Sequence, residues 1–538
     1  MDAYARRRAT LADSMLAEGG GVAIIPTAAE IPRNRDTDYP YRSDSYFHYL
    51  TNFPEPEAVL VLVATPGSGT ASVRSILFCR PKHEEREIWD GFRYGPKAAR
   101  RRFGMDEAHA IETIDDELPK LLADQPAVFY ALGSSAELDA RIQRWLGAVR
   151  GQARAGVAAP TRALDVTRPL DEMRLFKDAD EIATMRHAAR ISAEAHVAAM
   201  HATRPGRYEY EIEAELLYTF RRHGSQFPAY GSIVAGGANA CVLHYHANDA
   251  KLVDGTLLLI DAGCELDGYA SDITRTFPVN GRFSAAQRDL YDIVLAAQRA
   301  AEKLTRPGRH FMEPHDAAVK VLTQGMLDCK LIKGSLDGAI ESGAYRRFYM
   351  HRTGHWLGRD VHDCGEYREP AAAGKRPRRN TGASPAAKPW RKLQPGMVLT
   401  IEPGIYVRAA PDVPKAFHDI GIRIEDDALV TAHGCELLTS DVPKRADAIE
   451  ALMAERADAA AEAAARRLAQ KSPRPPAKLP AKPPVKQPPG EPPPPRRPRR
   501  AVEHAIAPPQ SRTTPARPRT VPPQPAPSQP LPSQRNGR

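Results

Sequence analysis

Apolar and polar positions alternate through the first 170 residues in a pattern that predicts short buried strands and few helices. Runs dense in Val, Ile, Leu and Ala are typical of buried strands, and one amphipathic stretch precedes them. The predicted helix spans residues 4–16, and the predicted strands span residues 21–26, 57–64, 75–79 and 128–132. Residues 1–170 are therefore predicted to form a mixed α/β domain.

A second pattern begins after residue 170, where Pro169 is expected to interrupt any helix. Asp178 and Glu181 have the three-residue spacing of a helix cap, and apolar residues follow at helical spacing. Further predicted helices span residues 209–222, 284–304 and 315–327. Strand-like runs lie between them, so residues 171–455 are predicted to form an α+β domain with helices on a curved antiparallel sheet.

Composition changes after residue 455. Residues 456–470 are rich in Ala, Arg and Glu, which favours a helical extension. Residues 471–538 hold 23 of the 49 prolines and contribute +12 to a net charge of +9, which leaves −3 for residues 1–470. This last segment is predicted to be a disordered, basic, proline-rich tail. Nucleic-acid binding by the tail is not expected, because no module that reads nucleic acid accompanies it.

Cysteine usage and apolar run lengths indicate the cellular setting. The six cysteines are scattered and form no CxxC pair, which favours the reducing cytoplasm. The N-terminus lacks the apolar core of a signal peptide, and no apolar run approaches membrane-spanning length. We therefore expect a cytoplasmic protein without a membrane partner.

One predicted hairpin, at residues 255–277, brings two acidic side chains together. An apolar run ends at Asp261, Asp267-Gly268 suits a two-residue turn, and Asp272 lies on the returning strand. A turn centred on that dipeptide makes Asp261 face Thr274 and puts both aspartates on one face, with Cα atoms roughly 7–8 Å apart. Converging carboxylates need a shared proton, a cationic side chain or a metal ion between them. The alternative to a metal is that Arg275 pairs with one aspartate while the other caps a turn.

Other stretches of the second domain add side chains that suit metal chemistry. Glu402, like Asp261, ends an apolar strand, where an unpaired charge would cost several kcal/mol. The remaining candidates are His244, His351, His355, His362 and Glu425, the last of which shares a strand face with Arg423.

An oxygen-rich ligand set can be drawn from these residues. Four carboxylates and one imidazole suit Mn²⁺, Co²⁺, Fe²⁺ or Mg²⁺ better than a thiolate zinc site, and they suffice to bridge two ions. The set is Asp261, Asp272, His355, Glu402 and Glu425. The chain has no HExxH, GxSxG or GxxxxGK[ST] motif, so no zincin, serine hydrolase or phosphate-loop site competes with this interpretation.

The stretches that carry these residues resemble those of aminopeptidase P, the Xaa-Pro aminopeptidases of the pita-bread metallopeptidase class. They read IDAGCELDGYASDITRTFPVNGRF, MHRTGHWLGRDVHD, LTIEPGIYV and GIRIEDD, and the likeness extends to RDTDYPYRSDSYFHYLTNF and EIW near the N-terminus. It covers roughly residues 1–455. The resemblance implies a pita-bread fold for the second domain, hydrolysis of the bond before a proline at the second position, and a homo-oligomer, either a dimer or a tetramer.

The resemblance also implies a role for each candidate residue. Two divalent ions, usually manganese, would be held by the five ligands, and a hydroxide that bridges them would attack the carbonyl carbon before proline. Glu402 would carry the proton from this nucleophile to the prolyl nitrogen. His244 and His362 would hydrogen-bond the substrate, and His351 would line the proline pocket. Residues implied to support the ligands are Arg423, Tyr230 and Thr274.

Two features depart from the family pattern, and several alternatives stay open. Arg352 stands where family members often carry glycine, and residues 365–390 form a basic loop longer than most. Trp89 of the EIW stretch is expected either to be a core residue or to reach a neighbouring subunit. Prolidase would use the same ligands on dipeptides alone. Creatinase-like enzymes, methionine aminopeptidase and non-catalytic pita-bread binding modules are further alternatives.

Overall fold

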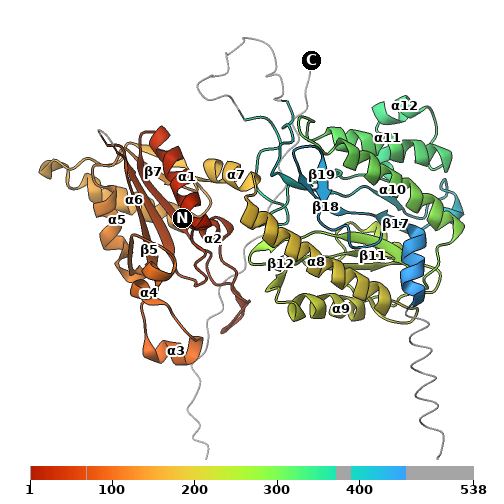
Figure 1. Ribbon diagram of the computed structural model, residues 1–538, viewed down its shortest axis with the longest axis horizontal. Coiled ribbons are helices and arrows are strands. Elements are labelled where there is room, and N and C mark those ends of the chain that lie inside the picture. The colour runs from red at the N-terminus through yellow and green to blue at the C-terminus, as the bar shows by residue number, and fades with distance from the viewer. Residues whose placement is uncertain (1, 68–69, 371–388, 456–538) are drawn as a thin grey trace, which may run out of the picture. The chain divides into compact units, whose positions relative to one another are not determined.

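The computed structural model describes residues 2–67, 70–370 and 389–455 (Figure 1). The predicted helical extension at 456–470, the predicted tail at 471–538 and most of the predicted loop at 365–390 lie outside these residues. Within the described residues, no helix combines the length and the apolar character that crossing a membrane would require.

A six-stranded mixed sheet with the order β6-β5-β4-β1-β7-β8 forms the centre of the N-terminal region. Its strands are β1 (Gly21–Pro26), β4 (Val59–Thr65), β5 (Ser72–Cys79), β6 (Glu107–Ala110), β7 (Ala127–Tyr130) and β8 (Arg162–Asp165). β4 pairs antiparallel with β1 and β5, and the other pairs are parallel. The mixed α/β expectation is therefore confirmed.

Helices cover both faces of this sheet because alternate residues of each strand point to opposite sides. Ala23 and Ile25 of β1 pack into one core with α1 and α2, whereas Val22 and Ile24 pack into another with α5 and α6. The helices are α1 (Ala3–Ala17), α2 (Ser45–Thr51), α4 (Gly95–Arg102), α5 (Ile114–Leu122) and α6 (Ala136–Arg150).

The short strands β2 (Pro32–Asn34) and β3 (Thr37–Asp38) form a separate two-stranded hairpin. Two other details differ from the sequence-based expectations. α3 (Glu84–Asp90) leaves Trp89 81% exposed, so Trp89 is not a core residue. Pro169 does not interrupt a helix but lies in the first turn of α7 (Thr167–Leu175), where a missing N–H costs nothing.

The second region consists of helices on short antiparallel sheets, which confirms the pita-bread expectation (Figure 1). The sheets have the orders β10-β11-β14, β13-β12-β9, β15-β18-β19 and β16-β17. Their strands are β9 (Phe227–Pro228), β10 (Ile233–Gly236), β11 (Leu257–Asp261), β12 (Cys264–Leu266), β13 (Tyr269–Ala270), β14 (Thr274–Pro278), β15 (Val398–Ile401), β16 (Gly404–Val407), β17 (Ile420–Arg423), β18 (Asp426–Val430) and β19 (Cys435–Leu437).

Two pairs of helices pack on these strands and enclose one large apolar core. α8 packs against α9, and α10 packs against α11, with the short α12 beside α11. The bounds are α8 (Ala179–Ala202), α9 (Glu209–Arg222), α10 (Ala285–Leu304), α11 (Glu313–Asp328) and α12 (Leu336–Glu341). The predicted caps are present, because Asp178 and Glu181 form a capping box on α8 and Ser284 and Gln287 form one on α10.

The register of the acidic hairpin is the predicted one. Asp261 pairs with Thr274, and Glu265 pairs with Ala270 on either side of the turn at Asp267-Gly268. Gly263 is required between them, because a Cβ there would lie 1.7 Å from the carbonyl oxygen of Ser271. The pairs on either side of Gly263 keep one register without a bulge, so Asp261 and Asp272 point to the same side.

Candidate metal centre

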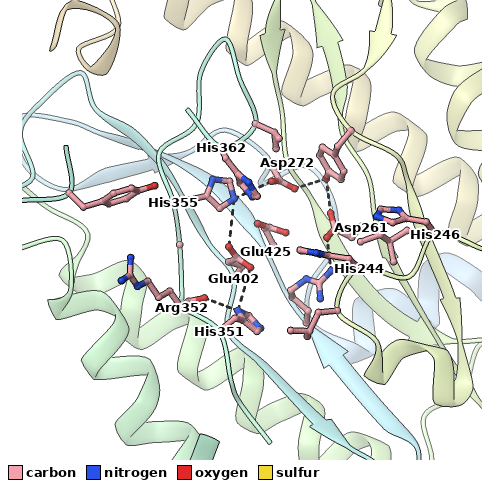
Figure 2. Close-up of a pocket in the computed structure, with 17 residues that line it drawn as sticks. His244, His246, Asp261, Asp272, His351, Arg352, His355, His362, Glu402 and Glu425 are labelled. Carbon is pink, nitrogen blue, oxygen red and sulfur yellow. Dashed lines mark hydrogen bonds and ion pairs between the residues drawn. The ribbon is translucent and has the colours of Figure 1, made fainter. Parts of the chain in front are cut away.

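A pocket of about 630 Å³ opens on the inner side of the antiparallel strands (Figure 2). The ends of β11, β15 and β17 and the loop at residues 351–363 each contribute polar side chains to it. The lining contains all eight candidate ligands and catalytic residues, namely Asp261, Asp272, His355, Glu402, Glu425, His244, His351 and His362. Stretches that are far apart in the sequence therefore meet at one place.

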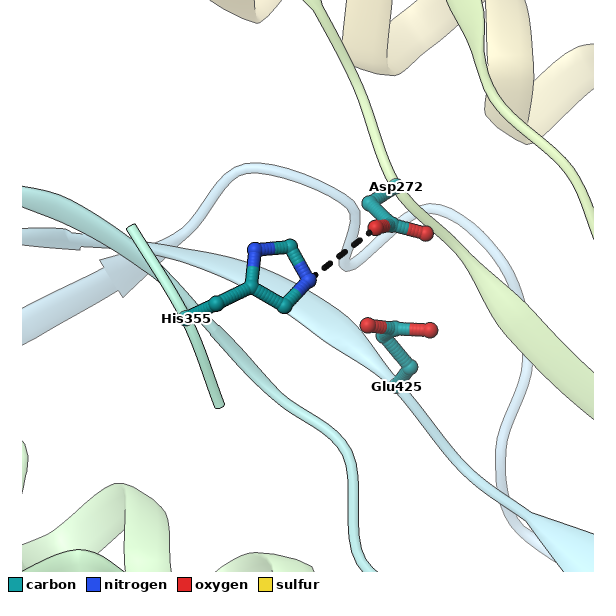
Figure 3. Close-up of side chains that lie close together, drawn as sticks. All are labelled: Asp272, His355 and Glu425. Carbon is teal, nitrogen blue, oxygen red and sulfur yellow. Dashed lines mark ion pairs between the residues drawn. The ribbon is translucent and has the colours of Figure 1, made fainter. Parts of the chain in front are cut away.

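Three of these side chains come close enough to share one ion. Asp272, His355 and Glu425 each offer a ligand atom, and these atoms all lie within 4.8 Å of one another (Figure 3). Asp272 and Glu425 are buried, with 5% and 2% exposure. Two carboxylates and an imidazole at this depth are a usual ligand set for a divalent ion.

The ring of His355 is held in the orientation that ligation needs. Its Nδ1 lies 2.9 Å from the carbonyl oxygen of Trp356, which can only accept, so Nδ1 donates. Its Nε2 lies 3.5 Å from Asp272 and 3.6 Å from Glu402. Burial lowers the pKa of His355, but the two carboxylates outweigh burial and raise it to about 9. The ring nitrogen that a metal would bind thus faces the acidic cluster.

Asp261 lies on the side of Asp272 away from His355, and two polar side chains hold its carboxylate (Figure 2). The hydroxyl of Tyr230 lies 2.6 Å from Asp261 and 2.5 Å from Asp272, and its single hydrogen can serve one of them at a time. Arg423 donates to Asp261 at 2.5 Å and to the hydroxyl of Thr274 at 3.1 Å. Thr274 in turn donates to Glu425 at 2.6 Å. The three residues predicted to support the ligands therefore contact them.

Glu402 follows β15 and lies between His351 and His355. Its carboxylate oxygens are 3.7 Å from Nδ1 of His351 and 3.6 Å from Nε2 of His355. Burial raises the pKa of Glu402 to about 7, with Asp272 and Asp261 adding to the shift and His355 and Arg423 opposing it. A carboxylate with a pKa near neutrality is suited to accept and return a proton.

The charges of the pocket do not balance without a cation. Four carboxylates converge, and the cations in the lining that pair with them are Arg423, on Asp261, and the protonated ring of His355, between Asp272 and Glu402. Two cations do not balance four carboxylates. Burial raises the pKa of Glu425 well above its usual value, and Asp272 and Glu402 raise it further. Divalent ions would relieve this repulsion, and the oxygen-rich donors fit such ions. The residues present therefore fit the implied metal.

The alternative explanation of the acidic hairpin is not what the structure contains. Arg275 pairs with neither Asp261 nor Asp272 but with Asp426, at 2.7 Å, on the other side of the sheet. Strand alternation explains the difference, because Arg275 follows Thr274 and points away from the pocket.

The three remaining histidines surround the acidic cluster. His362 is exposed to the pocket, and its ring centroid lies 4.4 Å from that of His355. His244 is exposed on the opposite wall of the pocket, and its ring centroid lies 6.4 Å from that of His246. Burial lowers the pKa of His351 to about 3, and Arg423 adds to this, so its ring is neutral. Its Nδ1 donates to the carbonyl of Arg352, and its Nε2 accepts from the hydroxyl of Tyr406.

The sequence interpretation missed two groups that support the pocket. The hydroxyl of Tyr406 accepts from Arg423 at 3.0 Å and thereby links Arg423 to His351. Asp427 is 1% exposed and accepts from the backbone N–H of Asp272. The stretch LTIEPGIYV contains Tyr406 two residues into β16, but no rule on spacing distinguishes it from a core tyrosine.

Comparisons with known proteins match this site and fold. Residues 183–432 match the model of metallopeptidase family M24, and residues 4–130 match that of the aminopeptidase P N-terminal domain. The chain is 42% identical over 450 residues to the Xaa-Pro aminopeptidase of Escherichia coli, covering 84% of this chain and 97% of the relative. The chain belongs to the aminopeptidase P family. It is accordingly a metal-dependent aminopeptidase of the Xaa-Pro class.

Solved aminopeptidase P structures share the whole described fold. An aminopeptidase from Pseudomonas aeruginosa superposes with a TM-score of 0.79 at 49% identity, over 85% of this chain and 98% of that one. An Escherichia coli aminopeptidase P variant in complex with substrate gives a TM-score of 0.79 at 42% identity, again over 85% and 98%. The family assignment disfavours the non-catalytic, creatinase-like and methionine aminopeptidase alternatives.

Proposed function

We propose that the pocket is a dinuclear metal centre, with manganese as its ions, that removes the residue preceding a proline at the second position of a peptide. Asp261 and Asp272 would hold one ion, Asp272, His355 and Glu425 the other, and Glu402 and Glu425 would bridge them. When bound, the ions supply a water of lowered pKa as the nucleophile and a positive charge for the carbonyl oxygen of the substrate.

The observation that carries this proposal is the excess of carboxylates in one pocket. A site that had only to fold would pair each buried carboxylate with a cation, since an unpaired buried charge is costly. Here four carboxylates face one another, and a single arginine is paired with Asp261. The assembly of all five ligands from four separate stretches supports two ions.

The chain's own groups account for the proton transfers and the orientation of the substrate. Glu402 takes the proton of the nucleophile and returns it to the prolyl nitrogen. His244 and His362 donate hydrogen bonds to the carbonyl oxygen on which charge develops. The neutral ring of His351 lines the proline pocket.

The position of Asp261 explains why cleavage starts at a free N-terminus. Its carboxylate lies at the end of the cluster away from Glu402 (Figure 2). The free amine of the first residue of the substrate would bind at this end. An acetylated N-terminus has neither the charge nor the lone pair to bind there. The amine and the scissile carbonyl are thus fixed one residue apart.

Three peptides test this function on the metal-stripped protein with added Mn²⁺. They are Xaa-Pro-Xaa, its N-acetylated form and the dipeptide Xaa-Pro. We expect release of the first residue from the free tripeptide alone. Activity confined to the dipeptide would make the enzyme a prolidase, and silence on all three with metal bound would contradict the proposal.

We also propose an oligomeric state and a cellular location. α3 and the residues just after it expose Ile88, Trp89 and Phe92, by 81%, 81% and 66%, which supports a homo-oligomer, a dimer or tetramer, in which this segment is covered. Analytical ultracentrifugation would test it. All six cysteines are free, which supports the cytoplasm as the location, and cell fractionation would test that.

A further inference from the structure

Arg352 lines the pocket beside the acidic cluster, and the proposed reaction assigns it no role. Its side chain is exposed, and it follows His351 directly in the loop that carries three of the histidines. Of the two arginines in the lining, Arg423 is paired with Asp261. Arg352 forms no ion pair within the described parts of the chain. The segment 371–388, which lies outside them, has five Lys and Arg and no Asp or Glu, so it offers no carboxylate either.

Two arginines of this region are ion-paired, whereas Arg346, like Arg352, forms no ion pair within the described residues. Arg347 pairs with Asp412 at 2.5 Å, and Arg391 pairs with Glu172 at 2.5 Å. The guanidinium of Arg352 instead lies 5.4 Å from the ring centroid of Trp390. A cation over an indole keeps its N–H groups available at the ring's edge.

Trp390 is a support that Arg352 shares with Arg368, whose guanidinium lies nearer, 3.3 Å from the ring centroid. The backbone of Trp390 forms an antiparallel bridge with Arg368, and its carbonyl oxygen lies 2.7 Å from Nδ1 of His310. The arginine side chain therefore rests on an anchored ring, so less freedom is lost when it binds a ligand.

The direction of the substrate places Arg352 downstream of the proline. Asp261 and His244 lie on one side of the acidic cluster, and Arg352 lies on the other, beyond Glu402 and His351 (Figure 2). On the proposed function, on which this inference rests, the amine binds near Asp261 and the prolyl nitrogen near Glu402. The chain after proline then runs towards Arg352.

We propose that Arg352 is a specificity residue that binds a carboxylate of the substrate downstream of the proline. The carboxylate belongs either to the C-terminus of a short peptide or to an acidic side chain at the third position. A planar guanidinium suits both through paired hydrogen bonds. The enzyme should therefore prefer a peptide with a carboxylate at this place over an otherwise identical peptide in which that carboxylate is an amide.

Four tripeptide substrates separate the two sources. They are Ala-Pro-Ala, Ala-Pro-Ala-amide, Ala-Pro-Asp-amide and Ala-Pro-Asn-amide, each assayed for kcat and KM with the metal-loaded full-length enzyme. We expect Arg352→Gln to raise KM roughly threefold to tenfold for the peptides with a carboxylate, with kcat little changed. The KM of peptides that lack a carboxylate should not move. A loss restricted to Ala-Pro-Ala assigns the C-terminus, and a loss restricted to the Asp peptide assigns the side chain.

Arg346→Gln is the matched control. Arg346 is an exposed arginine over an aromatic ring, 5.9 Å from the centroid of Tyr345, and it does not line the pocket. Its variant should leave all four substrates unchanged. Arg352→Lys should retain part of the preference for a carboxylate, because the positive charge remains but the paired N–H donors of the planar guanidinium are lost.

The outcome that overturns the inference is distinct from failure of the proposed function. If the wild type cleaves all four peptides and Arg352→Gln affects them equally or not at all, Arg352 binds no carboxylate. If the wild type cleaves none of them, the proposed function is wrong and this inference falls with it.

Discussion

Glu425 and Asp426 are neighbours in the chain with opposite surroundings. Asp426 begins β18, is fully buried, and points away from the pocket. Arg275 lies 2.7 Å from its carboxylate and Lys444 lies 2.6 Å from it, and the hydroxyl of Thr439 donates to it at 2.7 Å. Burial would raise the pKa of Asp426, but the two cations outweigh burial and hold it below its usual value. This carboxylate is balanced within the protein.

Glu425 has no such balance. It faces Asp272, Glu402 and Asp261, and the hydroxyl of Thr274 is the donor that reaches it, at 2.6 Å. The pKa of Glu425 is raised by burial and by these carboxylates together. Charge balance, more than burial, distinguishes a structural carboxylate from a proposed metal ligand here. Substitutions at the two positions should therefore fail in different ways.

The largest expected effect is on catalysis at Glu425. Glu425→Gln keeps the shape of the side chain but removes a ligand, so kcat/KM for a Xaa-Pro-Xaa peptide should fall at least about 100-fold, beyond the 10- to 100-fold typical of residues that only support ligands. The melting temperature of the metal-free variant should be unchanged or higher, because a neutral amide replaces a repelled carboxyl. A clear loss of metal-free stability would contradict the comparison.

The next effect is on stability at Asp426. Asp426→Asn leaves Arg275 buried without its carboxylate, which should cost about 3 kcal/mol of the free energy of unfolding. Chemical denaturation of the metal-free protein measures this loss. The carboxylate does not line the pocket, so folded Asp426→Asn at low temperature should keep kcat within a few fold. A variant of full stability but no activity would reverse the assignment of the two residues.

The sequence already contained much of this comparison, but not all of it. The turn at Asp267-Gly268 fixed the register, and from it the shared face of Asp261 and Asp272 followed by alternation. The partner of Arg275 could not be derived, because Asp426 is 151 residues away and comes together with it only when β14 and β18 pack. Tyr406 and the exposure of Trp89 depend equally on tertiary packing. The five candidate ligands were proposed from the resemblance to the family's motifs, and their spacing alone left a metal-free pair open.

The pH dependence of the metal-free protein should follow the unbalanced cluster. The pKa of Glu402 is raised from 4.5 to about 7 and that of His355 from 6.5 to about 9, so the folded state holds more protons than the unfolded state between these values. Below about pH 6.5 the buried histidines with lowered pKa values, among them His351, oppose this trend, so the loss of stability is expected as pH rises from about 7 to about 9. Thermal melts with chelator at pH 7, 8 and 9 should show a falling melting temperature.

Added metal and the carboxylate of Asp426 provide the controls for these melts. Added Mn²⁺ should restore stability most at high pH, where the ligands are deprotonated. Asp426 should contribute nothing to the slope, because a lowered carboxyl pKa affects stability only in acid. A metal-free melting temperature that rises from pH 7 to pH 9 would contradict the charge imbalance.

The smallest effect is expected at Tyr230. Tyr230→Phe removes the hydroxyl shared by Asp261 and Asp272 and leaves every ligand in place, so affinity for Mn²⁺ should fall about 10- to 100-fold. Calorimetric titration measures it. Tyr245→Phe is the matched control, because that hydroxyl donates to Glu209 outside the pocket. Equal affinities for the two variants would remove Tyr230 from the support of the ligands.

The most direct test of the metal centre is a count of bound ions against activity. Metal-stripped protein is titrated with Mn²⁺, bound metal is measured by mass spectrometry, and cleavage of a Xaa-Pro-Xaa peptide is followed at each point. The account predicts no cleavage without metal, two ions per chain at saturation, and loss of this binding in Glu425→Gln. Full activity in the stripped protein, or saturation of activity without any contribution from Glu425, would contradict it.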